Sequence, residues 1–358
     1  DIEDSSNVLT LATSYTDTAG NTGAGATTAN YAIDTKEPTV SSFTMSDTSL
    51  IVGETATVTL VFSEAVASFS SSADITVQNG SLSTMTSSDN ITWTGTFTPT
   101  DDIEDSSNVL TLATSYTDTA GNSPESTATT ANYAIDTKEP TITSVTNSWG
   151  SCLNSTEDNS AGTVTVVTSG AEDGQTVTVT LNSSNYTGTV SSNSTTVTIS
   201  ASGLQGLTDG SSYTVTANVS DVYGNAATAV SSDSFSVDVT SPTMTITSST
   251  VNSGSTSNDS SIALTFTSSE STTNFVVGDI TVSNGTLSNF SGSGTTYTAT
   301  FTPSSDGAST IDVAAEEYTD SSGNQNTAAT QFTWTYDGTP PTITSVTNSW
   351  GSCLNSTE

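Results

Sequence analysis

Apolar residues recur at every second position in short segments along the whole chain. Val58, Leu60 and Phe62 alternate with polar residues in TVTLVFSE, and the segment TVTVTL at 176–181 has the same alternation. A period of two gives each segment one buried and one solvent-exposed face, which is the pattern of an antiparallel β-sheet. Several such segments in every ~100 residues, separated by turns rich in Gly, Asn, Asp and Ser, predict an all-β chain of two-sheet sandwiches.

The sequence also repeats itself over long distances. DIEDSSNVLTLATSYTDTAGN stands at 1–21 and again at 102–122, and TITSVTNSWGSCLNSTE stands at 141–157 and again at 342–358. The copies of the second segment lie about twice as far apart as those of the first, so two sequence types alternate with a period near ~100 residues. This pattern predicts a tandem array of domains.

A recurring Asp-x-x-x-Pro motif marks the expected domain boundaries. It runs from Asp34 to Pro38, Asp136 to Pro140, Asp238 to Pro242 and Asp337 to Pro341. Proline there stiffens the exit from one domain and opens the first strand of the next. The predicted units are the C-terminal part of a domain (1–34), three complete domains (35–136, 137–238 and 239–337) and the N-terminal part of another (338–358). The sequence is therefore expected to be a window cut from a longer array.

The composition excludes several classes of function. The 358 residues include 37 Asp and Glu residues against 2 Lys and Arg residues, and the formal net charge is -35. Such a chain is not expected to bind nucleic acid or an anionic membrane surface, because both are themselves negative. No apolar run is long enough to span a bilayer, so no membrane insertion of this segment is expected. Divalent cations are the natural partners of so many carboxylates, although an acidic surface can also simply keep a chain soluble.

Several motifs resemble those of known families. FSEAV, SSADITVQNGSLS and VVGDITVSNGTLSNF resemble bacterial Ig-like repeats, whereas GAEDGQTVTVTL, DVYGNAATA and FSVDVTSP resemble the Ig-like units of giant secreted, RTX-type surface adhesins. The resemblance covers essentially the whole chain. It implies Ig-like antiparallel sandwiches strung as an extended rod, in an extracellular or cell-surface location, often with calcium stiffening the joints.

Carboxylates are expected to gather where consecutive sandwiches meet. The loop after the second strand and the loop between the last two strands should lie at the end that receives the linker from the previous domain. Each of these loops carries an acid, and the linkers add their own. The candidate metal ligands are Asp34, Glu37, Glu64, Asp118 and Asn122 at the first joint, Asp136, Glu139, Glu172, Asp221 and Asn225 at the second, Asp238, Glu270, Asp320 and Asn324 at the third, and Asp337 at the start of a fourth.

Calcium is the cofactor that this arrangement favours. Close carboxylates repel one another unless a cation lies between them, and Ca²⁺ accepts about six to eight oxygen ligands in irregular geometry. One or more Ca²⁺ ions at each joint would turn a flexible chain into a stiff rod. The third joint is expected to be the weaker site, because its linker brings Asp238 without a matching Glu. The alternative is that these Asp and Asn residues only cap turns, since both commonly precede glycine in turns.

The two cysteines are not expected to pair with each other. Cys152 and Cys353 hold equivalent positions in two copies of one segment, so two sandwiches separate them, whereas a disulfide needs Cα atoms within about 7 Å. Each is therefore expected to be a buried thiol or to cross-link another chain. The four tryptophans are expected in cores or joints: Trp93, Trp149, Trp334 and Trp350.

Architecture accounts for these features better than chemistry does. The predicted function is the structural extender of a large surface adhesin, whose partners are the neighbouring domains of the same chain. One alternative is a repeat protein whose identical chains assemble into an extracellular filament or sheath through edge strands or Cys152. Another is a string of carbohydrate-binding modules, which would need a repeated, exposed aromatic platform that the sequence does not show. An enzyme is not expected, because the chain has no His and no Cys beside a base.

Overall fold

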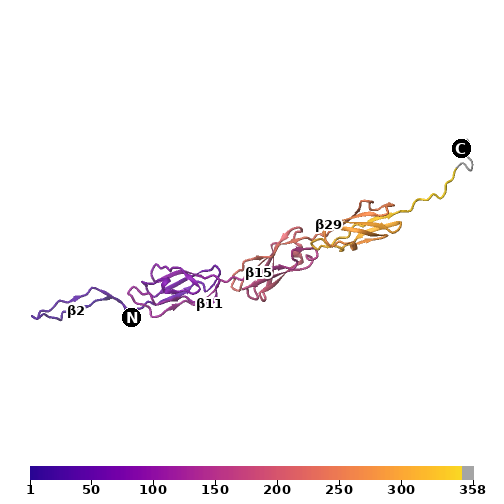
Figure 1. Cartoon of the computed structure of the whole chain (residues 1–358). Helices are drawn as coiled ribbons and strands as arrows, with labels where there is room; N and C mark the ends of the chain where they lie inside the picture. The colour runs from indigo at the N-terminus through magenta and orange to yellow at the C-terminus, as the bar shows by residue number, and fades with distance from the viewer. Residues whose placement is uncertain (349–358) are drawn as a thin grey trace.

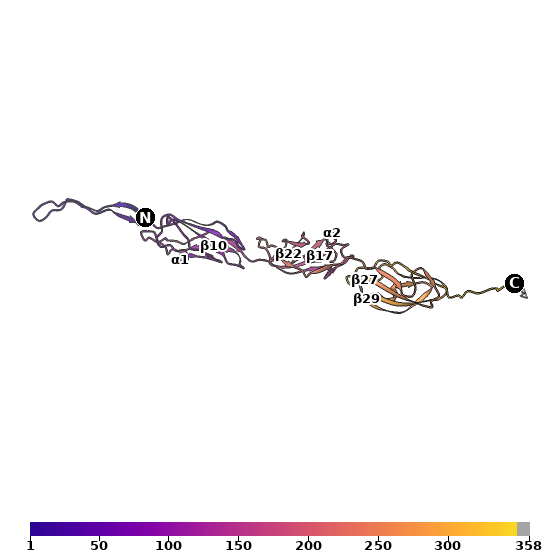
Figure 2. The ribbon, with the colours of Figure 1, turned by 90° about the horizontal axis from the view of Figure 1, so that it is seen from above.

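The computed structural model describes residues 1–348, which form an extended string of β-sheet units (Figure 1). Three sandwiches follow one another along the string, and each has its own cluster of buried hydrophobic residues. A view turned by 90° shows the same end-to-end order, with the N-terminal strands at one end and the C-terminal segment at the other (Figure 2). The chain is therefore all-β and built in tandem, as the sequence predicts.

The N-terminal residues form four short strands in two antiparallel pairs. β1 (Glu3–Asn7) pairs with β4 (Tyr31–Asp34), and β2 (Thr10–Leu11) pairs with β3 (Ala26–Thr27). The sequence predicts the C-terminal part of a domain at 1–34, and these four strands lie in that range. Leu11 and Tyr31 are exposed, while Leu112 and Tyr133, which hold the same places in the repeat, are fully buried. The difference arises because only the second copy is covered by a facing sheet.

The first sandwich extends from β5 to β14. Its elements are β5 (Val40–Met45), β6 (Ser49–Ile51), β7 (Ala56–Phe62), α1 (Ser71–Asp74), β8 (Ile75–Thr76), β9 (Gly80–Leu82), β10 (Thr92–Pro99), β11 (Glu104–Asn108), β12 (Thr111–Leu112), β13 (Ala128–Thr129) and β14 (Tyr133–Asp136). One sheet has the order β5-β7-β10-β9, and the second layer consists of β11-β14-β6 and β13-β12-β8. Val58, Leu60 and Phe62 on β7 are all buried, as their alternation predicts.

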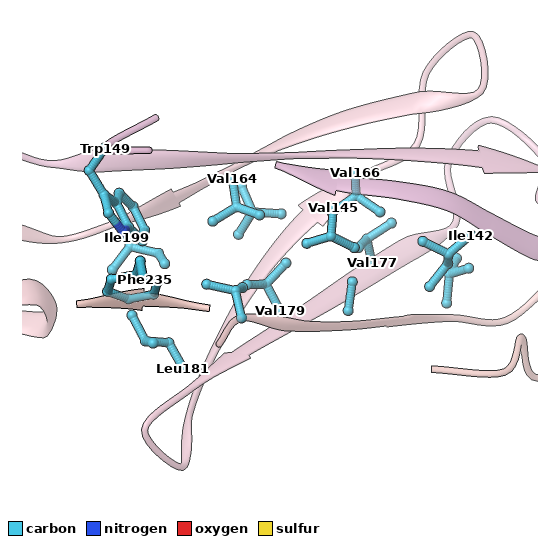
Figure 3. Packing of buried hydrophobic residues seen from close by; sticks show 14 of the residues in the cluster. Ile142, Val145, Trp149, Val164, Val166, Val177, Val179, Leu181, Ile199 and Phe235 are labelled. Carbon is cyan, nitrogen blue, oxygen red and sulfur yellow. The ribbon is translucent and has the colours of Figure 1, made fainter. Parts of the chain in front are cut away.

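The second sandwich extends from β15 to β24. Its elements are β15 (Thr141–Asn147), β16 (Cys152–Leu153), β17 (Gly162–Ser169), β18 (Thr176–Leu181), β19 (Ser184–Thr189), β20 (Ser194–Ile199), α2 (Ala201–Gln205), β21 (Ser212–Tyr213), β22 (Thr216–Val219), β23 (Val230–Ser231) and β24 (Phe235–Val237). The sheet β15-β17-β20 packs against β19-β18-β22-β23 and β16-β24-β21. Figure 3 shows Val145, Val166 and Val177 between the layers, and Trp149 beside Phe235 with ring centroids 5.3 Å apart. Trp149 is thus a core residue, as expected.

The third sandwich extends from β25 to β31. Its elements are β25 (Met244–Ser248), β26 (Ser255–Ser257), β27 (Ile262–Thr272), the 3₁₀ turn η1 (Val277–Asp279), β28 (Ile280–Val282), β29 (Gly285–Pro303), β30 (Gly307–Val313) and β31 (Phe332–Tyr336). The sheets are β25-β27-β29 and β26-β31-β30-β28. Trp334 is buried at the centre of this core, and Trp93 of the first sandwich is partly buried against its own core.

The described residues after β31 form no strand, although 342–348 repeat the sequence of β15. β15 is held in place by pairing with β17, and no counterpart of β17 follows in the 358 residues. Cys152 is a free thiol and is half-buried, less buried than the sequence predicts. Trp350 and Cys353 lie outside the described residues.

Candidate metal centre at the joints

Three carboxylates meet at the first joint, where β4 leads into the first sandwich. Asp34 ends β4, Glu64 follows β7, and Asp118 lies in the connection between β12 and β13. One oxygen from each carboxylate lies within 4.8 Å of the other two. The two loops therefore do reach the end of the sandwich that receives the linker, as the sequence predicts.

The D-x-x-GN motif explains how Asp118 is held in this position. Its Oδ1 accepts the main-chain N–H groups of Ala120, Gly121 and Asn122 at 2.8, 2.7 and 2.9 Å, and its Oδ2 accepts Asn122 Nδ2 at 2.8 Å. Gly121 has φ +97°, a conformation that favours glycine. Asp221 and Asp320 make the corresponding bonds in the other two sandwiches. Turn capping is thus one role of these Asp residues.

The carboxylate of Asp118 stays ionised in spite of its burial. Burial alone would raise its pKa, but the hydrogen bonds from Asn122, Gly121 and Ala120 outweigh that effect and lower the pKa below its ordinary value. Asp118 therefore presents a fixed negative charge to the first joint at neutral pH.

Glu64 is the member of this group whose surroundings fit a cation best. Its Oε1 is buried and has no hydrogen-bond partner. Burial raises the pKa of Glu64, and the charges of Asp34 and Asp118 raise it further. Buried polar atoms normally have a partner, so an oxygen without one beside two other carboxylates has the surroundings of a ligand.

The third joint repeats this arrangement with Asp238, Glu270 and Asp320. One oxygen from each again lies within 4.8 Å of the others, and burial followed by the charges of Asp238 and Asp320 raises the pKa of Glu270. Sequence reasoning ranked this joint as the weaker one, but it builds the same three-carboxylate group as the first joint. The ranking gave weight to a linker Glu that takes no part in either group.

Asp209 is a further acid at the third joint that the sequence analysis missed. It lines one hollow with Asp238, Glu270 and Ser322. Its carboxylate accepts the N–H of Val239 at 3.0 Å and the hydroxyl of Thr240 at 2.6 Å, so it holds the linker as it leaves the second sandwich. The only sequence signal was an Asp-Gly turn before β21, which many loops share.

The second joint is different. Within residues 1–348, Asp136, Glu172 and Asp221 do not form a group of the kind found at the other two joints. Glu172 is exposed, and its Oε2 accepts the N–H of Val222 at 2.9 Å. Asp136 is buried, and that burial raises its pKa. The structure therefore brings together two of the three predicted carboxylate groups.

The remaining candidates lie apart from these groups. Glu37 is half-buried, and Glu139 and Asp337 are exposed. None of the three belongs to a three-carboxylate group among the described residues. Lys36 pairs instead with Glu3 across the first joint, at 3.4 Å between Nζ and Oε2.

The asparagines of the motif contact the linkers. Asn122 Nδ2 lies 3.3 Å from the carbonyl oxygens of Asp34 and Lys36, and Asn225 Nδ2 donates to the carbonyl of Asp136 at 3.0 Å. Asn324 Nδ2 donates to the carbonyl of Asp238 at 2.9 Å. These residues were predicted as metal ligands, and in the structure their amide N–H groups hold the linker.

Comparison with known families identifies the repeated unit. The bacterial Ig-like domain family matches residues 34–135 and 238–336, which together make up more than half of the chain. The chain belongs to the bacterial Ig-like domain family. The members of this family are structural and binding domains rather than enzymes, which agrees with the expectation from the sequence.

Solved structures of three bacterial adhesins are similar to the chain. A 1.5-MDa bacterial ice-binding adhesin is 19% identical over 85% of this chain and 98% of its own, with a TM-score of 0.39. A Ca²⁺-stabilized adhesin that helps an Antarctic bacterium bind ice is 20% identical over 90% and 79%, with a TM-score of 0.37. The Escherichia coli adhesin FdeC is 15% identical over 83% and 96%, with a TM-score of 0.32. At such identities the likeness concerns the fold alone. No curated protein matches the chain significantly.

Proposed function

We propose that this chain is an extender region of a large bacterial surface adhesin, in which calcium at carboxylate-lined joints keeps successive Ig-like sandwiches in line. The observation that carries the proposal is the position of the carboxylates. Both three-carboxylate groups among the described residues lie where one unit meets the next, and each combines one residue at the end of a unit with two residues of the following sandwich. A cation there would tie the linker to the body of the sandwich.

The proposed ligands are Asp34, Glu64 and Asp118 at the first joint, and Asp238, Glu270 and Asp320 at the third. Calcium would supply the positive charge that cancels the repulsion among these carboxylates. Glu64 Oε1, which has no hydrogen-bond partner, would coordinate the ion. Asp118 and Asp320 are already held in place by hydrogen bonds from their own loops.

An extracellular or cell-surface location belongs to the same proposal. The net charge of -35 and the tandem Ig-like units suit a long chain that must stay soluble and extended outside the cell. Millimolar calcium would then be sufficient for sites of modest affinity. Within residues 1–348, no helix is long and apolar enough to cross a bilayer.

Calcium titration and small-angle scattering test this proposal. The intact chain is expected to bind calcium by calorimetry, and its maximum dimension is expected to fall when EGTA is added. Replacing Glu64 and Glu270 together by Gln should abolish most of the binding. Glu139→Gln is the matched control, because Glu139 is an exposed acid outside both groups. If neither the maximum dimension nor the melting temperature of the chain changed on addition of EGTA, the proposal would be ruled out.

Assembly of identical chains into an extracellular filament or sheath is the second candidate. The observation that favours it is the free thiol of Cys152, a residue that is half-buried rather than enclosed in the core. Non-reducing electrophoresis and sedimentation would detect cross-linked or associated chains. A string of carbohydrate-binding modules finds less support. The exposed aromatic residues among those described are Tyr15, Tyr31 and Tyr223, and they form no repeated platform.

A further inference from the structure

A single asparagine connects both sides of the second joint. Asn225, on the loop between β22 and β23, donates Nδ2–H to the carbonyl of Asp136 in the linker, at 3.0 Å. Its Oδ1 accepts the N–H of Val52 at 2.9 Å, and Val52 follows β6 in the first sandwich. Asn225 is buried, with 2% of its surface exposed. One amide therefore ties the second sandwich to the linker and to the body of the first sandwich.

The surroundings of Asn225 hold this amide in a fixed orientation. Its Nδ2 also donates to Asp221 Oδ2 at 2.8 Å, and Asp221 Oδ1 accepts three N–H groups of the same loop. Glu172 accepts the N–H of Val222 in that loop, so its charge is directed at its own sandwich. Tyr223 lines a small hollow together with Asp136 and other residues of the first sandwich. The polar groups at this joint are thus satisfied by protein atoms.

The other joints show which part of this arrangement is shared. At the third joint, Asn324 Nδ2 donates to the carbonyl of Asp238 at 2.9 Å, and Oδ1 accepts the N–H of Ser155, shortly after β16, at 2.7 Å. This joint has the three-carboxylate group in addition. At the first joint, Asn122 reaches only linker carbonyls, at 3.3 Å. The second joint is therefore the one that has the amide contact without the carboxylate group.

We propose that Asn225 makes the second joint a calcium-independent lock, so that the first and second sandwiches stay aligned when calcium is removed. The lock itself needs no ion, because Nδ2 and Oδ1 of Asn225 both form hydrogen bonds with main-chain groups across the joint. The contrast with the other joints rests on the calcium proposal above. At the third joint, removal of calcium would leave Asp238, Glu270 and Asp320 to repel one another. This repulsion would oppose the hydrogen bonds by which Asn324 holds the joint together.

Distances between spin labels on the intact chain test this proposal. In a background with Cys152→Ser and Cys353→Ser, labels at Thr57→Cys and Thr198→Cys span the second joint, and labels at Thr198→Cys and Thr298→Cys span the third. All three threonines are exposed on strands. With EGTA, the distance distribution across the second joint is expected to stay narrow, while that across the third joint widens.

Replacement of the asparagine isolates the lock from calcium. Asn225→Ala is expected to widen the distribution across the second joint both with calcium and with EGTA. Asn185→Ala is the matched control, because this exposed asparagine of the same sandwich bonds only within its own hairpin. Circular dichroism verifies that each variant is folded.

The outcomes separate the two proposals. Widening across the second joint on addition of EGTA, or no widening on Asn225→Ala in a folded chain, overturns the lock. If EGTA leaves the distance distribution across the third joint unchanged while Asn225→Ala widens that across the second, the calcium proposal is wrong and the lock is supported.

Discussion

Replacing Glu64 by Gln is expected to have opposite effects on stability with and without calcium. Glu64 carries one of three charges whose oxygens lie within 4.8 Å of one another. At an effective dielectric constant of about 20, each pair at that separation repels by roughly 3.5 kcal/mol. Glu64 is only half-buried, so solvent and salt reduce this to about 1 kcal/mol per pair. Without calcium, removal of the charge should therefore stabilise the first joint by about 1–2 kcal/mol.

With calcium the same change removes a ligand. Calcium at a hundredfold excess over its Kd stabilises a protein by about 2.7 kcal/mol, and each tenfold loss of affinity takes back about 1.4 kcal/mol. The variant should therefore melt at a lower temperature than the parent in calcium, and at a higher temperature in EGTA. In a unit of this size, 1 kcal/mol corresponds to about 4–8 °C.

Differential scanning calorimetry of the intact chain under both conditions measures these shifts. The matched control is Glu139→Gln, which should change neither melting curve because Glu139 is exposed and lies outside the carboxylate groups. If Glu64→Gln raised the melting temperature equally in calcium and in EGTA, the carboxylates would repel without holding an ion, and the reasoning would be refuted.

Three further predictions concern the same loops and cores. Gly121→Ala should destabilise the first sandwich by about 1–2 kcal/mol in urea unfolding, because Gly121 has φ +97° and a Cβ there meets no neighbouring atom, so only backbone strain is added. In EGTA, stability should rise as the pH is lowered towards 4.5, because the raised pKa values of Glu64 and Glu270 mean that the folded state binds protons more readily than the unfolded state. Thermal melting in EGTA at several pH values down to 4.5 shows whether stability rises or falls as the pH is lowered. Trp149→Ala should cost the second sandwich about 3–5 kcal/mol in denaturant unfolding, because it leaves a cavity beside Phe235, and Trp149→Phe should cost less.

The fold could be predicted from the sequence because its signals are local. The alternation at Val58, Leu60 and Phe62 follows directly from the two faces of a strand, and all three are buried. The D-x-x-GN loop could be placed because Gly121 meets a backbone requirement that few other residues meet. Such features depend on residues that are close together in the chain.

The joints were predictable only in part, because their contacts depend on loop length and on main-chain groups. Glu64 and Glu172 follow the equivalent strands β7 and β17, but Glu172 lies in the tight turn 170–175, whereas Glu64 lies near the start of the long connection 63–74, which contains α1. The tight turn keeps Glu172 at its own loop, where it accepts the N–H of Val222. The partner of Asn225 is a main-chain N–H, which every residue except proline carries and no sequence pattern marks.

The parallel pairing that closes each sandwich bears on how the string responds to tension. β6 runs parallel to β14, β16 to β24 and β26 to β31, so a pull on the two ends of the chain loads these hydrogen bonds in shear. Bonds loaded in shear must rupture together rather than one after another. The first and third sandwiches have three residue pairs in this parallel pairing, and the second has two. Under a steady pull, the second sandwich is therefore expected to unfold first.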